Sequence, residues 1–572
     1  MEIKEISSRA PREQGLLKKS LSNSKESKLT GWDYTILVAS ISGLLLSCII
    51  ISSKKYFWTD ELFSYYMTSE PSLGRMLAAF HDKLNNTPLL YFLLGWGWDK
   101  LFGSAELSLR LFSSLGMAAA LLLTWATLRR TYALWATATG TLLVFCTSQV
   151  ILNQNAEARM YGLFLALSAM AFLLYDNFYR NTTISYKFLI INALVHVAII
   201  HTHLFGGFYS GAILVAFFAT DRVLKLYRPK LYLSILLSWI SVVFYLPSFL
   251  IQADAGKPRT WIPAPDFVDL LDIYNLTKPT WIGRRFLLFI ALVLFIYLIR
   301  KGNIKKLIKN INIPTTEIPV LIFGFCLLIV PIAIWIISLT IKPIFYDRYM
   351  IPSAIGWVIL FSFIASKTVF SKKNISAISK NPALLLAPIL ALIFTTAYPI
   401  IFAKGFRKQN YPGTTDMLPE IAKKYAHLPK VVTSSGTFLE RNYYAPDRPN
   451  YFFIMDWKSA VDPNSGTFPP QSYKHMEAWK RNFPQFFQDN VVSSEDFLSH
   501  HDNFLVIDYP DYLKRCPLKH AGLHVTDLWT NYLECPQWVE VRLLNDKKYK
   551  VTFLSNEYWF SILLVEKIKP NL

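Results

Sequence analysis

The sequence predicts a polytopic α-helical membrane protein that carries a soluble α/β or α+β domain at its C-terminal end. Hydrophobic residues make up 53% of the 572 residues and charged residues only 17%, whereas a soluble domain carries about 25% charged residues. The mean hydropathy of +0.29 comes from many separate apolar runs, most of them long enough to cross a hydrocarbon core about 30 Å thick. Residues 404–572, in contrast, have an ordinary soluble composition.

The N-terminal part begins with a polar segment and continues with apolar runs. Residues 1–33 are rich in Ser and Lys, which predicts a disordered cytoplasmic tail. The run Tyr34–Ile51 lies too far from the N-terminus for a signal peptide, and no small-residue cleavage pattern follows it, so we predict a retained membrane helix. Eleven further apolar runs occupy residues 89–102, 106–128, 131–152, 160–178, 186–205, 207–220, 231–251, 285–299, 318–341, 349–366 and 382–403.

The basic residues indicate that eleven of these twelve runs cross the membrane, because Lys and Arg in short loops are retained on the cytoplasmic side. If Leu89–Phe102 crossed, the basic loops 222–230, 300–309 and 367–380 would lie opposite the basic N-terminal tail. If this shorter run, with Pro88 before it, instead lies in the interface or re-enters, all three loops are cytoplasmic. We therefore predict that it does not cross.

This topology divides the chain into three parts. After the tail, residues 34–403 form the transmembrane domain, whose first exoplasmic loop covers about residues 54–105, and residues 404–572 form a soluble exoplasmic domain. In that last domain we predict strands at Lys430–Thr433, Asn503–Ile507, Val539–Leu543 and Lys550–Phe553, and a helix at Asp416–Tyr425. Cys516 and Cys535 would lie in an oxidising compartment, where their spacing allows either a disulfide or two free thiols.

The formal net charge of +20 does not indicate a nucleic-acid partner. The basic residues lie mostly between the apolar runs, where retention of positive charge in the cytoplasm explains them. The five cysteines show no CxxC spacing and no Cys/His cluster, so the sequence gives no support for a zinc site. The bilayer itself is the partner that the composition predicts.

The topology also places five polar features together on the exoplasmic side. They are Asp60-Glu61, Glu157-Ala158-Arg159, His201-Thr202-His203, the loop Gln252–Gly283, and Tyr346-Asp347-Arg348-Tyr349. Charged groups at membrane level are costly to desolvate, so they need water, a counter-ion or a function.

Asp60 and Glu61 follow the first membrane helix almost directly. One interpretation is structural, since Thr59 or Asp60 would serve as the N-cap of a short helix from Leu62 to Ser69. The other is catalytic, since a carboxylate that faces a cavity at membrane level is suited to act as general base toward an acceptor hydroxyl.

Arg159 and Arg348 each stand at the outer start of a membrane helix. The planar guanidinium donates two hydrogen bonds to phosphate oxygens, so two such arginines suit one lipid phosphate. A structural ion pair between Arg159 and Glu157 is the alternative, although residues two apart do not face each other on a helix. Arg110, taken alone, is interpreted as an arginine whose charge reaches the interface.

His201 and His203 lie at the outer end of a helix. Spaced by two residues, they share a face only where the backbone is extended, so a metal or proton-transfer role competes with interfacial packing. Glu61 together with His201 and His203 is the candidate ligand set for a divalent cation, and we predict no other cofactor.

In sequence order, these features resemble a known family. An exoplasmic Asp60-Glu61, the segments Pro88-Leu89-Leu90-Tyr91 and Leu109-Arg110-Leu111, Ala158-Arg159-Met160-Tyr161, and Asp347 to Pro352 resemble the polytopic glycosyltransferases of the C fold (GT-C). Within that fold the likeness is to family 39 protein O-mannosyltransferase-like enzymes, Rgt-type lipopolysaccharide glycosyltransferases and lipid A aminoarabinose transferases. The resemblance covers about residues 34–365, and Asn86-Thr87-Pro88 departs from it where relatives often have two prolines.

The resemblance implies an inverting transfer of a sugar, a hexose such as mannose or a pentose, from polyprenyl phosphate to a glycan, lipid or protein at the outer face of the plasma (inner) membrane. It implies that Asp60, with Glu61 beside it, activates the acceptor, and that Arg159 approaches the lipid phosphate. We add Arg348 on electrostatic grounds. Glu157, His201, His203, Tyr346 and Tyr349 are expected to line the site.

Three alternative functions are open. A flippase of lipid-linked sugars would commonly show inverted repeats and charges near the bilayer midplane, and we find no repeat. An oligosaccharide ligase of the same fold is the second alternative. The third is a non-catalytic scaffold in which Asp60-Glu61 only caps a helix.

Overall fold

The structure, a computed structural model, describes residues 29–181, 185–255, 262, 264–274, 313–367, 424–460, 470–508, 540–544, 546–557 and 560–568. Several predictions lie outside these residues: most of the N-terminal tail, the crossings at 285–299 and 382–403, half of the loop Gln252–Gly283, most of the helix Asp416–Tyr425, and both Cys516 and Cys535.

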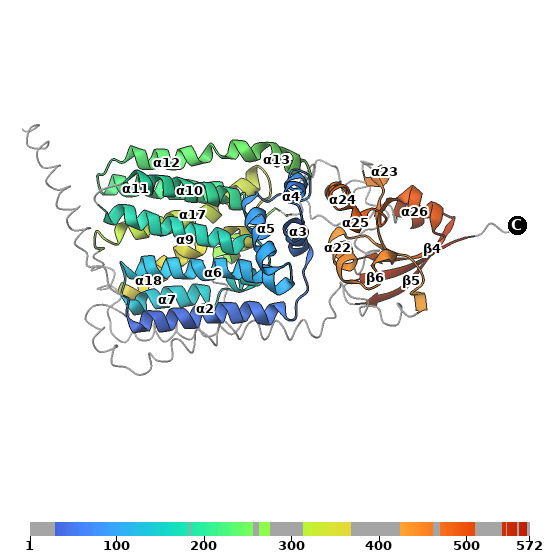
Figure 1. Ribbon diagram of the computed structural model, residues 1–572, viewed down its shortest axis with the longest axis horizontal. Coiled ribbons are helices and arrows are strands. Elements are labelled where there is room, and N and C mark those ends of the chain that lie inside the picture. Colours follow the sequence, from blue (N-terminus) through green and yellow to red (C-terminus); the bar gives the residue numbers. More distant parts are fainter. Residues whose placement is uncertain are drawn as a thin grey trace, which may run out of the picture.

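Long helices run side by side in a bundle, and short helices lie across one end of it (Figure 1). The bundle helices are α2 (Gly31–Ser52), α6 (Glu106–Arg129), α7 (Leu134–Phe145), α8 (Gln149–Asn155), α9 (Tyr161–Arg180), α10 (Tyr186–Thr202), α11 (Gly206–Val223), α12 (Pro229–Trp239), α13 (Val242–Ala255), α17 (Ile318–Thr340) and α18 (Ser353–Lys367). The helices that lie across one end of the bundle are α3 (Thr59–Thr68), α4 (Leu73–Phe80) and α5 (Leu90–Phe102). We call the end of the bundle that carries α3, α4 and α5 the outer end, and the opposite end the inner end.

Five helical segments in the described ranges are long and apolar enough to cross a membrane: α2, α6, α9, the continuous segment Pro229–Ala255, and α17. The helices α7, α10 and α18 are shorter but apolar. These lengths fit a hydrocarbon core of about 30 Å, as expected for an integral membrane protein.

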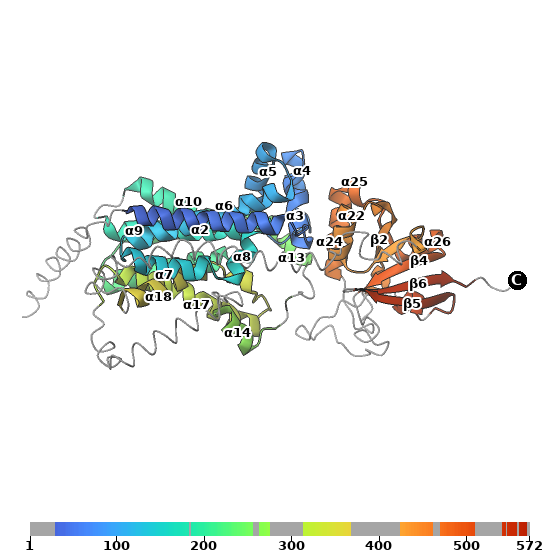
Figure 2. The ribbon, with the colours of Figure 1, turned by 90° about the horizontal axis from the view of Figure 1, so that it is seen from below.

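The segment between α2 and α6 does not cross the bundle, as predicted. The side chain of Arg110, near the start of α6, bonds the carbonyl oxygen of Lys55, just after α2, so α2 ends and α6 begins at the outer end. The helix α5 has 13 residues and is therefore about 20 Å long, too short to span the core. In Figure 2 it stands across the bundle axis together with α4.

Basic side chains gather at the inner end. Arg129, at the end of α6, pairs with Asp33 in the first turn of α2 at 2.6 Å, and Arg180, at the end of α9, bonds Thr131. Arg228, just before α12, bonds the carbonyl oxygen of Phe178. This is the distribution expected if the inner end faces the cytoplasm.

Two predicted boundaries were wrong. The helix α2 begins at Gly31 and buries Asp33, so three residues assigned to the tail belong to the membrane domain. The run 131–152 is not one helix, because α7 ends at Phe145 and α8 starts anew at Gln149. The Ser148 hydroxyl caps α8 by accepting the N–H of Ile151, which favours a break within the apolar run.

Close backbone contact joins α6 to α9. A Cβ atom on Gly116 of α6 would lie 2.5 Å from the carbonyl carbon of Gly162 in α9. Glycine at both positions therefore lets the two backbones approach more closely than side chains would allow, a common device in membrane helix packing.

The C-terminal domain is an α/β domain with a six-stranded sheet in the order β3-β2-β1-β4-β6-β5. The strands are β1 (Lys430–Val432), β2 (Tyr451–Met455), β3 (Val491–Ser493), β4 (Asn503–Asp508), β5 (Tyr549–Glu557) and β6 (Phe560–Lys567). The first four pair in parallel, and β6 pairs antiparallel with both β4 and β5. Helices α22 (Ser435–Tyr444), α24 (Pro470–Asn482) and α26 (Ser494–His500) connect the parallel strands, as such pairing requires.

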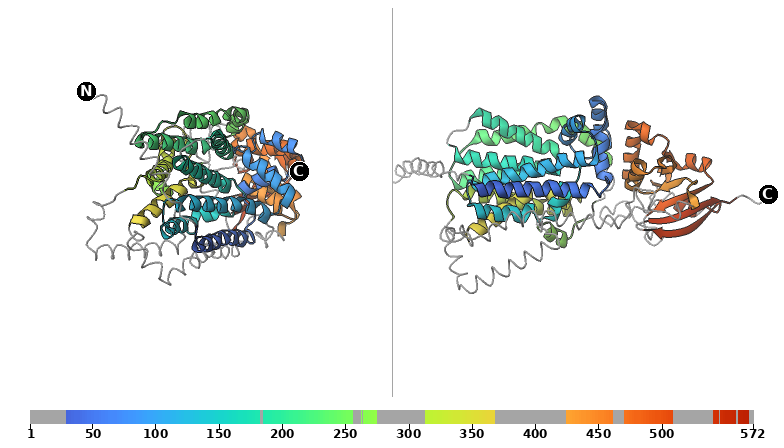
Figure 3. Two further views of the ribbon diagram at one scale, coloured as in Figure 1. Left: turned by 60° about the vertical axis from the view of Figure 1, so that its left-hand side comes forward. Right: turned by 60° about the horizontal axis from the view of Figure 1, so that its bottom comes forward.

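Three of the four predicted strands are present, and the fourth was wrong, since residues Glu540–Leu544 form a π-helical turn. The domain lies against the outer end of the bundle, with α22 and α24 next to α3 and α4 (Figures 1 and 3). Contacts between the two domains include Arg481 with Asp82 at 2.9 Å and Lys474 with Asp254 at 3.4 Å.

The glycine contact between α6 and α9 predicts that a methyl group added at Gly116 lowers the melting temperature, whereas one added at a glycine without close neighbours does not. Gly116→Ala lowers the melting temperature of the detergent-solubilised protein, because overpacking a tight contact costs about 1–3 kcal/mol. Gly97→Ala in α5, where no atom lies within 4 Å of the new Cβ, is neutral or slightly stabilising, because alanine favours helix by about 1 kcal/mol. Equal melting temperatures for the two variants would contradict the close packing.

Candidate active site

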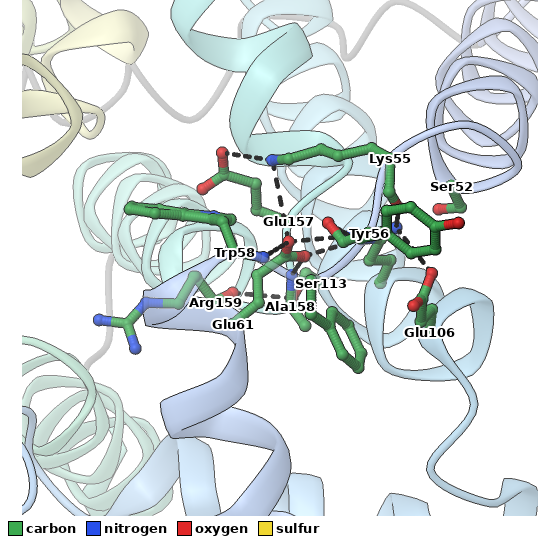
Figure 4. A network of polar contacts seen from close by, with 12 residues as sticks. Ser52, Lys55, Tyr56, Trp58, Glu61, Glu106, Ser113, Glu157, Ala158 and Arg159 are labelled. Carbon is green, nitrogen blue, oxygen red and sulfur yellow. Dashed lines mark hydrogen bonds and ion pairs between the residues drawn. The ribbon is translucent and has the colours of Figure 1, made fainter. Parts of the chain in front are cut away.

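Three chain segments meet at the outer end of the bundle. They are residues 55–61, which lead into α3, the turn Glu157–Met160 between α8 and α9, and the 3-10 helix η1 (Asp347–Met350) before α18. Figure 4 shows the polar contacts among the first two. The prediction that the polar features at these positions share one end of the protein therefore agrees with the arrangement of the described residues.

Glu61 and Arg110 form a fully buried ion pair. Both side chains have 0% exposure, and Arg110 bonds Glu61 through Nε at 2.7 Å and Nη2 at 2.8 Å. The Glu61 carboxylate also accepts the backbone N–H groups of Ala158 at 2.9 Å and Trp58 at 3.4 Å. Burial alone would raise the pKa of Glu61, but the charges of Arg110 and Lys55 and these hydrogen bonds hold this pKa below its usual value, so the carboxylate is ionised.

Arg110 also fixes the main chain before α3. Its Nη1 donates to the carbonyl oxygen of Lys55 at 2.7 Å and its Nη2 to that of Tyr56 at 2.9 Å. The interpretation of Arg110 as an arginine that reaches the interface was therefore wrong. Its guanidinium has carbonyl and carboxylate acceptors inside the protein, which compensate for the loss of its hydration.

Lys55 lies between two carboxylates. Its Nζ is 3.2 Å from Glu157 and 3.8 Å from Glu61, and it faces the ring of Trp58 at 5.8 Å. Glu157 is thus paired with Lys55, and the alternative of a Glu157–Arg159 ion pair is not what the structure shows. Glu61, Glu157, Arg110 and Lys55 together form a charge-balanced cluster in which each ion has an opposite partner.

Asp60, one residue from Glu61, points to a different set of groups. Its carboxylate is 2.9 Å from Arg348 and 4.0 Å from Arg159, and its side chain is 21% exposed. Arg159 is held by the carbonyl oxygen of Asp60 at 3.0 Å and by the Ser64 hydroxyl at 3.4 Å. Its Nε–H is buried and has no hydrogen-bond partner among the described residues.

This difference separates the two acids that the sequence paired as catalytic candidates. Every oxygen of Glu61 is buried and bonded, so Glu61 cannot meet an acceptor, and its position argues against the predicted catalytic role. Asp60 is reachable from solvent and lies beside two buried cations. Asp60 is therefore the carboxylate that can take part in chemistry.

Aromatic rings surround Arg348. Its guanidinium lies 4.8 Å from the ring of Tyr346, 5.1 Å from Trp58, 5.9 Å from Tyr349 and 6.0 Å from Tyr161. Ring faces attract a cation without neutralising it, so the site keeps positive charge available. Burial raises the pKa of Tyr346 and of Tyr349, and both phenols stay neutral.

His203 is buried near Arg159 and Arg348 as a neutral ring. It stacks on Phe164 at 5.0 Å and lies 5.1 Å from Tyr349, and its Nδ1 accepts the N–H of Phe205 at 3.1 Å. Burial, with a further contribution from Arg159 and Arg348, lowers the pKa of His203 to about 3. A proton-transfer role at neutral pH is therefore disfavoured.

His201 belongs to another part of the bundle. It lies within α10 and contacts the Ser241 hydroxyl at 3.0 Å, whereas His203 follows the helix in extended backbone. The predicted cation ligands Glu61, His201 and His203 therefore do not converge. In the part of the chain that the structure describes, no group of three or more His, Cys, Asp or Glu side chains is arranged to hold a metal ion.

Sequence reasoning missed several residues at this end. Lys55, Trp58 and Tyr161 line it, and Tyr444 and Glu440 reach it from the C-terminal domain. The sequence also did not reveal that Arg110 is buried in an ion pair. Only for this residue did it contain a signal, because an arginine inside an apolar helix needs a partner.

Comparison with known proteins identifies the architecture. No protein-family model matches the chain, and no curated protein matches it. The crystal structure of ArnT from Cupriavidus metallidurans bound to undecaprenyl phosphate is similar over 94% of this chain and 98% of that chain, with a TM-score of 0.50 and 11% identity. The chain has the GT-C fold.

A second GT-C structure, ArnT from the same organism in the apo state, covers 93% of this chain and 98% of its own, with a TM-score of 0.49 and 12% identity. At 11% identity the likeness to the undecaprenyl-phosphate-bound structure establishes the fold alone. The narrower resemblance to family 39 and Rgt-type enzymes stays a prediction.

The buried pair predicts a pH-dependent loss of stability. The pKa of Glu61 is lowered on folding from its ordinary value of 4.5. The contribution of its ionised form to the free energy of unfolding is therefore complete well above pH 4.5, and it is lost as the pH falls through the pKa that Glu61 has in the folded protein. At pH 7, Glu61→Gln costs about 3–5 kcal/mol, since Arg110 is left without its counter-charge. The melting-temperature difference between wild type and variant therefore shrinks as the pH is lowered below about 4.5.

Glu566→Gln is the matched control. Glu566 forms an exposed pair with Lys550 at 3.9 Å, and such surface pairs contribute about 0–1 kcal/mol. A melting-temperature difference for Glu61→Gln that is as small as that of the control, or that does not depend on pH, would contradict the assignment.

Proposed function

We propose that this protein is a membrane glycosyltransferase that moves a sugar from a polyprenyl-phosphate donor to an acceptor hydroxyl at the exoplasmic face, with inversion. The observation that carries the proposal is the position of Asp60. This partly exposed carboxylate lies 2.9 Å from Arg348 and 4.0 Å from Arg159 at the outer end of the bundle. The fold is shared with ArnT, a protein crystallised with undecaprenyl phosphate.

The two arginines suit a lipid phosphate. Both side chains are about nine-tenths buried, with exposures of 7% and 10%, and a guanidinium binds phosphate through parallel hydrogen bonds. The buried Nε–H of Arg159 lacks a partner among the described residues, and buried donors are nearly always satisfied. A phosphate oxygen would supply that acceptor.

Donor binding would also activate the base. Arg348 holds the Asp60 carboxylate through a hydrogen bond of 2.9 Å, which occupies an oxygen that would otherwise be open to an acceptor hydroxyl. A donor phosphate offers Arg348 a competing anion. In our proposal Arg348 turns from Asp60 to the phosphate, and Asp60 becomes free to accept a proton only when the donor is in place.

The reaction is then a single displacement. The acceptor hydroxyl gives its proton to Asp60 while its oxygen forms a bond to the anomeric carbon. The bond between that carbon and the phosphate oxygen breaks, and its electron pair leaves with polyprenyl phosphate. Arg159 and Arg348 stabilise the charge that develops on the phosphate, and the exposed side of Asp60 returns the proton to water.

The sugar, the acceptor and the cellular location that we propose are those implied by the sequence resemblance to GT-C glycosyltransferases. The sugar is a hexose such as mannose, or a pentose, the acceptor is a glycan, lipid or protein, and the enzyme resides in the plasma (inner) membrane. Residues 1–30 serve as the cytoplasmic tail, residues 31–403 as the transmembrane domain, which begins with α2 at Gly31, and residues 404–572 as the exoplasmic domain.

Asp60→Asn tests the base. In transfer of labelled sugar from a panel of polyprenyl-phosphate monosaccharides to envelope membranes, the variant loses at least about 100-fold in kcat, since a general base contributes about 10²–10⁴-fold. Its affinity for polyprenyl phosphate is unchanged or higher, because Arg348 no longer has a competing carboxylate. Arg348→Ala, in contrast, weakens that affinity by about tenfold or more, the loss expected for a charge-assisted hydrogen bond.

Asp489→Asn, at an exposed position of the C-terminal domain, serves as control and keeps wild-type rates. Equal rates for Asp60→Asn and wild type would remove Asp60 from the mechanism. Transfer only from a lipid-linked oligosaccharide included in the panel would indicate a ligase. Absence of transfer from every donor would favour the flippase or scaffold alternatives.

A further inference from the structure

The helix that carries Asp60 is enclosed from both sides. One side of α3 faces the membrane bundle through the Glu61–Arg110 pair. The other side faces the C-terminal domain, where Phe63 stacks on Trp479 at 5.3 Å, Tyr66 meets the same ring at 5.1 Å, and Tyr65 lies 4.9 Å from Tyr443. The C-terminal domain is thus part of the surroundings of the proposed active site.

The four residues before α3 are fixed one by one through their main chain. Arg110 binds the carbonyl oxygens of Lys55 and Tyr56. The N–H of Phe57 donates to the Tyr444 hydroxyl at 2.6 Å, and the N–H of Trp58 donates to Glu61. Three of these four hydrogen bonds end on the Glu61–Arg110 pair, and the bond at Phe57 comes from the C-terminal domain.

The Tyr444 hydroxyl has a second partner, Glu106, at the start of α6. Burial, together with the neighbouring Glu106, raises the pKa of Tyr444, so the phenol stays protonated, donates to Glu106 and accepts from Phe57. Glu106 in turn lies 3.7 Å from Arg110. Tyr444 therefore links the C-terminal domain to the ion-pair cluster through two directed hydrogen bonds.

Two more residues of α22 sit against the start of α3. A Cβ atom on Gly436 would lie closer to the Thr59 hydroxyl oxygen than van der Waals contact allows, so a larger residue at this position requires Thr59 to move. The buried Glu440 carboxyl lies near the N–H of Thr59, beside Arg441 and Lys55, and burial raises the pKa of Glu440 to about 8. One face of α22, which carries Gly436, Glu440 and Tyr444, therefore packs along residues 57–59, just before Asp60.

We propose that Tyr444 is a positioning residue for Asp60, and that α22 of the C-terminal domain is a structural part of the catalytic unit. This inference rests on the proposed function. The Tyr444 hydroxyl sets the position of Phe57, three residues before Asp60, and so sets where the first turn of α3 presents its carboxylate. A displacement of about 1 Å can cost about 100-fold in rate, so a contact that moves this turn affects turnover without touching the donor.

Tyr444→Phe is the variant that tests the inference. It removes one oxygen and keeps the ring that packs on Tyr56 at 4.6 Å. We expect kcat to fall about tenfold or more, the effect of a displacement well under 1 Å, while the KM for the polyprenyl-phosphate sugar changes less than about threefold, since the phosphate-binding arginines are untouched. Amide hydrogen exchange in a peptide that covers residues 54–62 becomes faster, since the N–H of Phe57 loses the Tyr444 hydroxyl and keeps only its interaction with Glu106.

Tyr443→Phe is the matched control on the same helix. Its ring meets Tyr65, Tyr66 and the side chain of Phe57, and its hydroxyl bonds Tyr65. Among the described residues these contacts do not include the main chain of residues 55–58, so the variant removes a hydroxyl and keeps the main-chain bond of Phe57. We expect wild-type kcat and wild-type exchange. Gly436→Ala, which disturbs Thr59 at the start of α3 while keeping Tyr444, is expected to change kcat and exchange in the same direction as Tyr444→Phe.

Wild type and Asp60→Asn are measured in the same assay. If wild type transfers sugar and Tyr444→Phe matches it in kcat, the inference is overturned while the proposed function stands. If wild type transfers no sugar from any donor, the proposed function fails, and the exchange measurement alone decides whether Tyr444 fixes this segment. Unchanged exchange in Tyr444→Phe would overturn the positioning role in either case.

Discussion

The buried pair of Glu61 and Arg110 is the interaction on which the outer end of the protein depends. Two ions withdrawn from water lose several kcal/mol of hydration each, so the pair is maintained only because all of its hydrogen-bonding groups find partners. Those partners are the main chain before α3 and the turn before α9. One ion pair thereby joins α6, α3 and the turn that carries Arg159, and it fixes the geometry that the proposed chemistry needs.

Adjacent residues perform different tasks here because of helix geometry. Consecutive side chains on an α-helix point about 100° apart, so the first turn of α3 directs Glu61 into the bundle and Asp60 toward Arg348 and Arg159. An acidic pair also suits the positive end of the helix dipole. Glu61 is therefore fixed and holds the segment before α3 in place, whereas Asp60 is more exposed and available for reaction.

Much of the fold could be predicted from the sequence, because the hydrophobic effect acts through local patterns. Apolar runs and the retention of basic loops identified the bundle and the non-crossing segment Leu89–Phe102, and they brought Asp60, Arg159 and Arg348 to one end. The partners of Arg110 could not be predicted, since Glu61 is 49 residues away and pairing at that range leaves no local signal. The contact of Phe57 with Tyr444 spans 387 residues. The histidine site failed for a local reason, because α10 ends between His201 and His203.

The central claim is that Arg348 exchanges the Asp60 carboxylate for the donor phosphate. A structure of the protein with polyprenyl phosphate bound, determined by electron cryo-microscopy in a lipid nanodisc, tests this most directly. We expect phosphate oxygens within hydrogen-bonding distance of both Arg159 and Arg348, and an Asp60 carboxylate released from Arg348 and facing solvent. A phosphate bound elsewhere, with the Asp60–Arg348 contact of 2.9 Å intact, would contradict it.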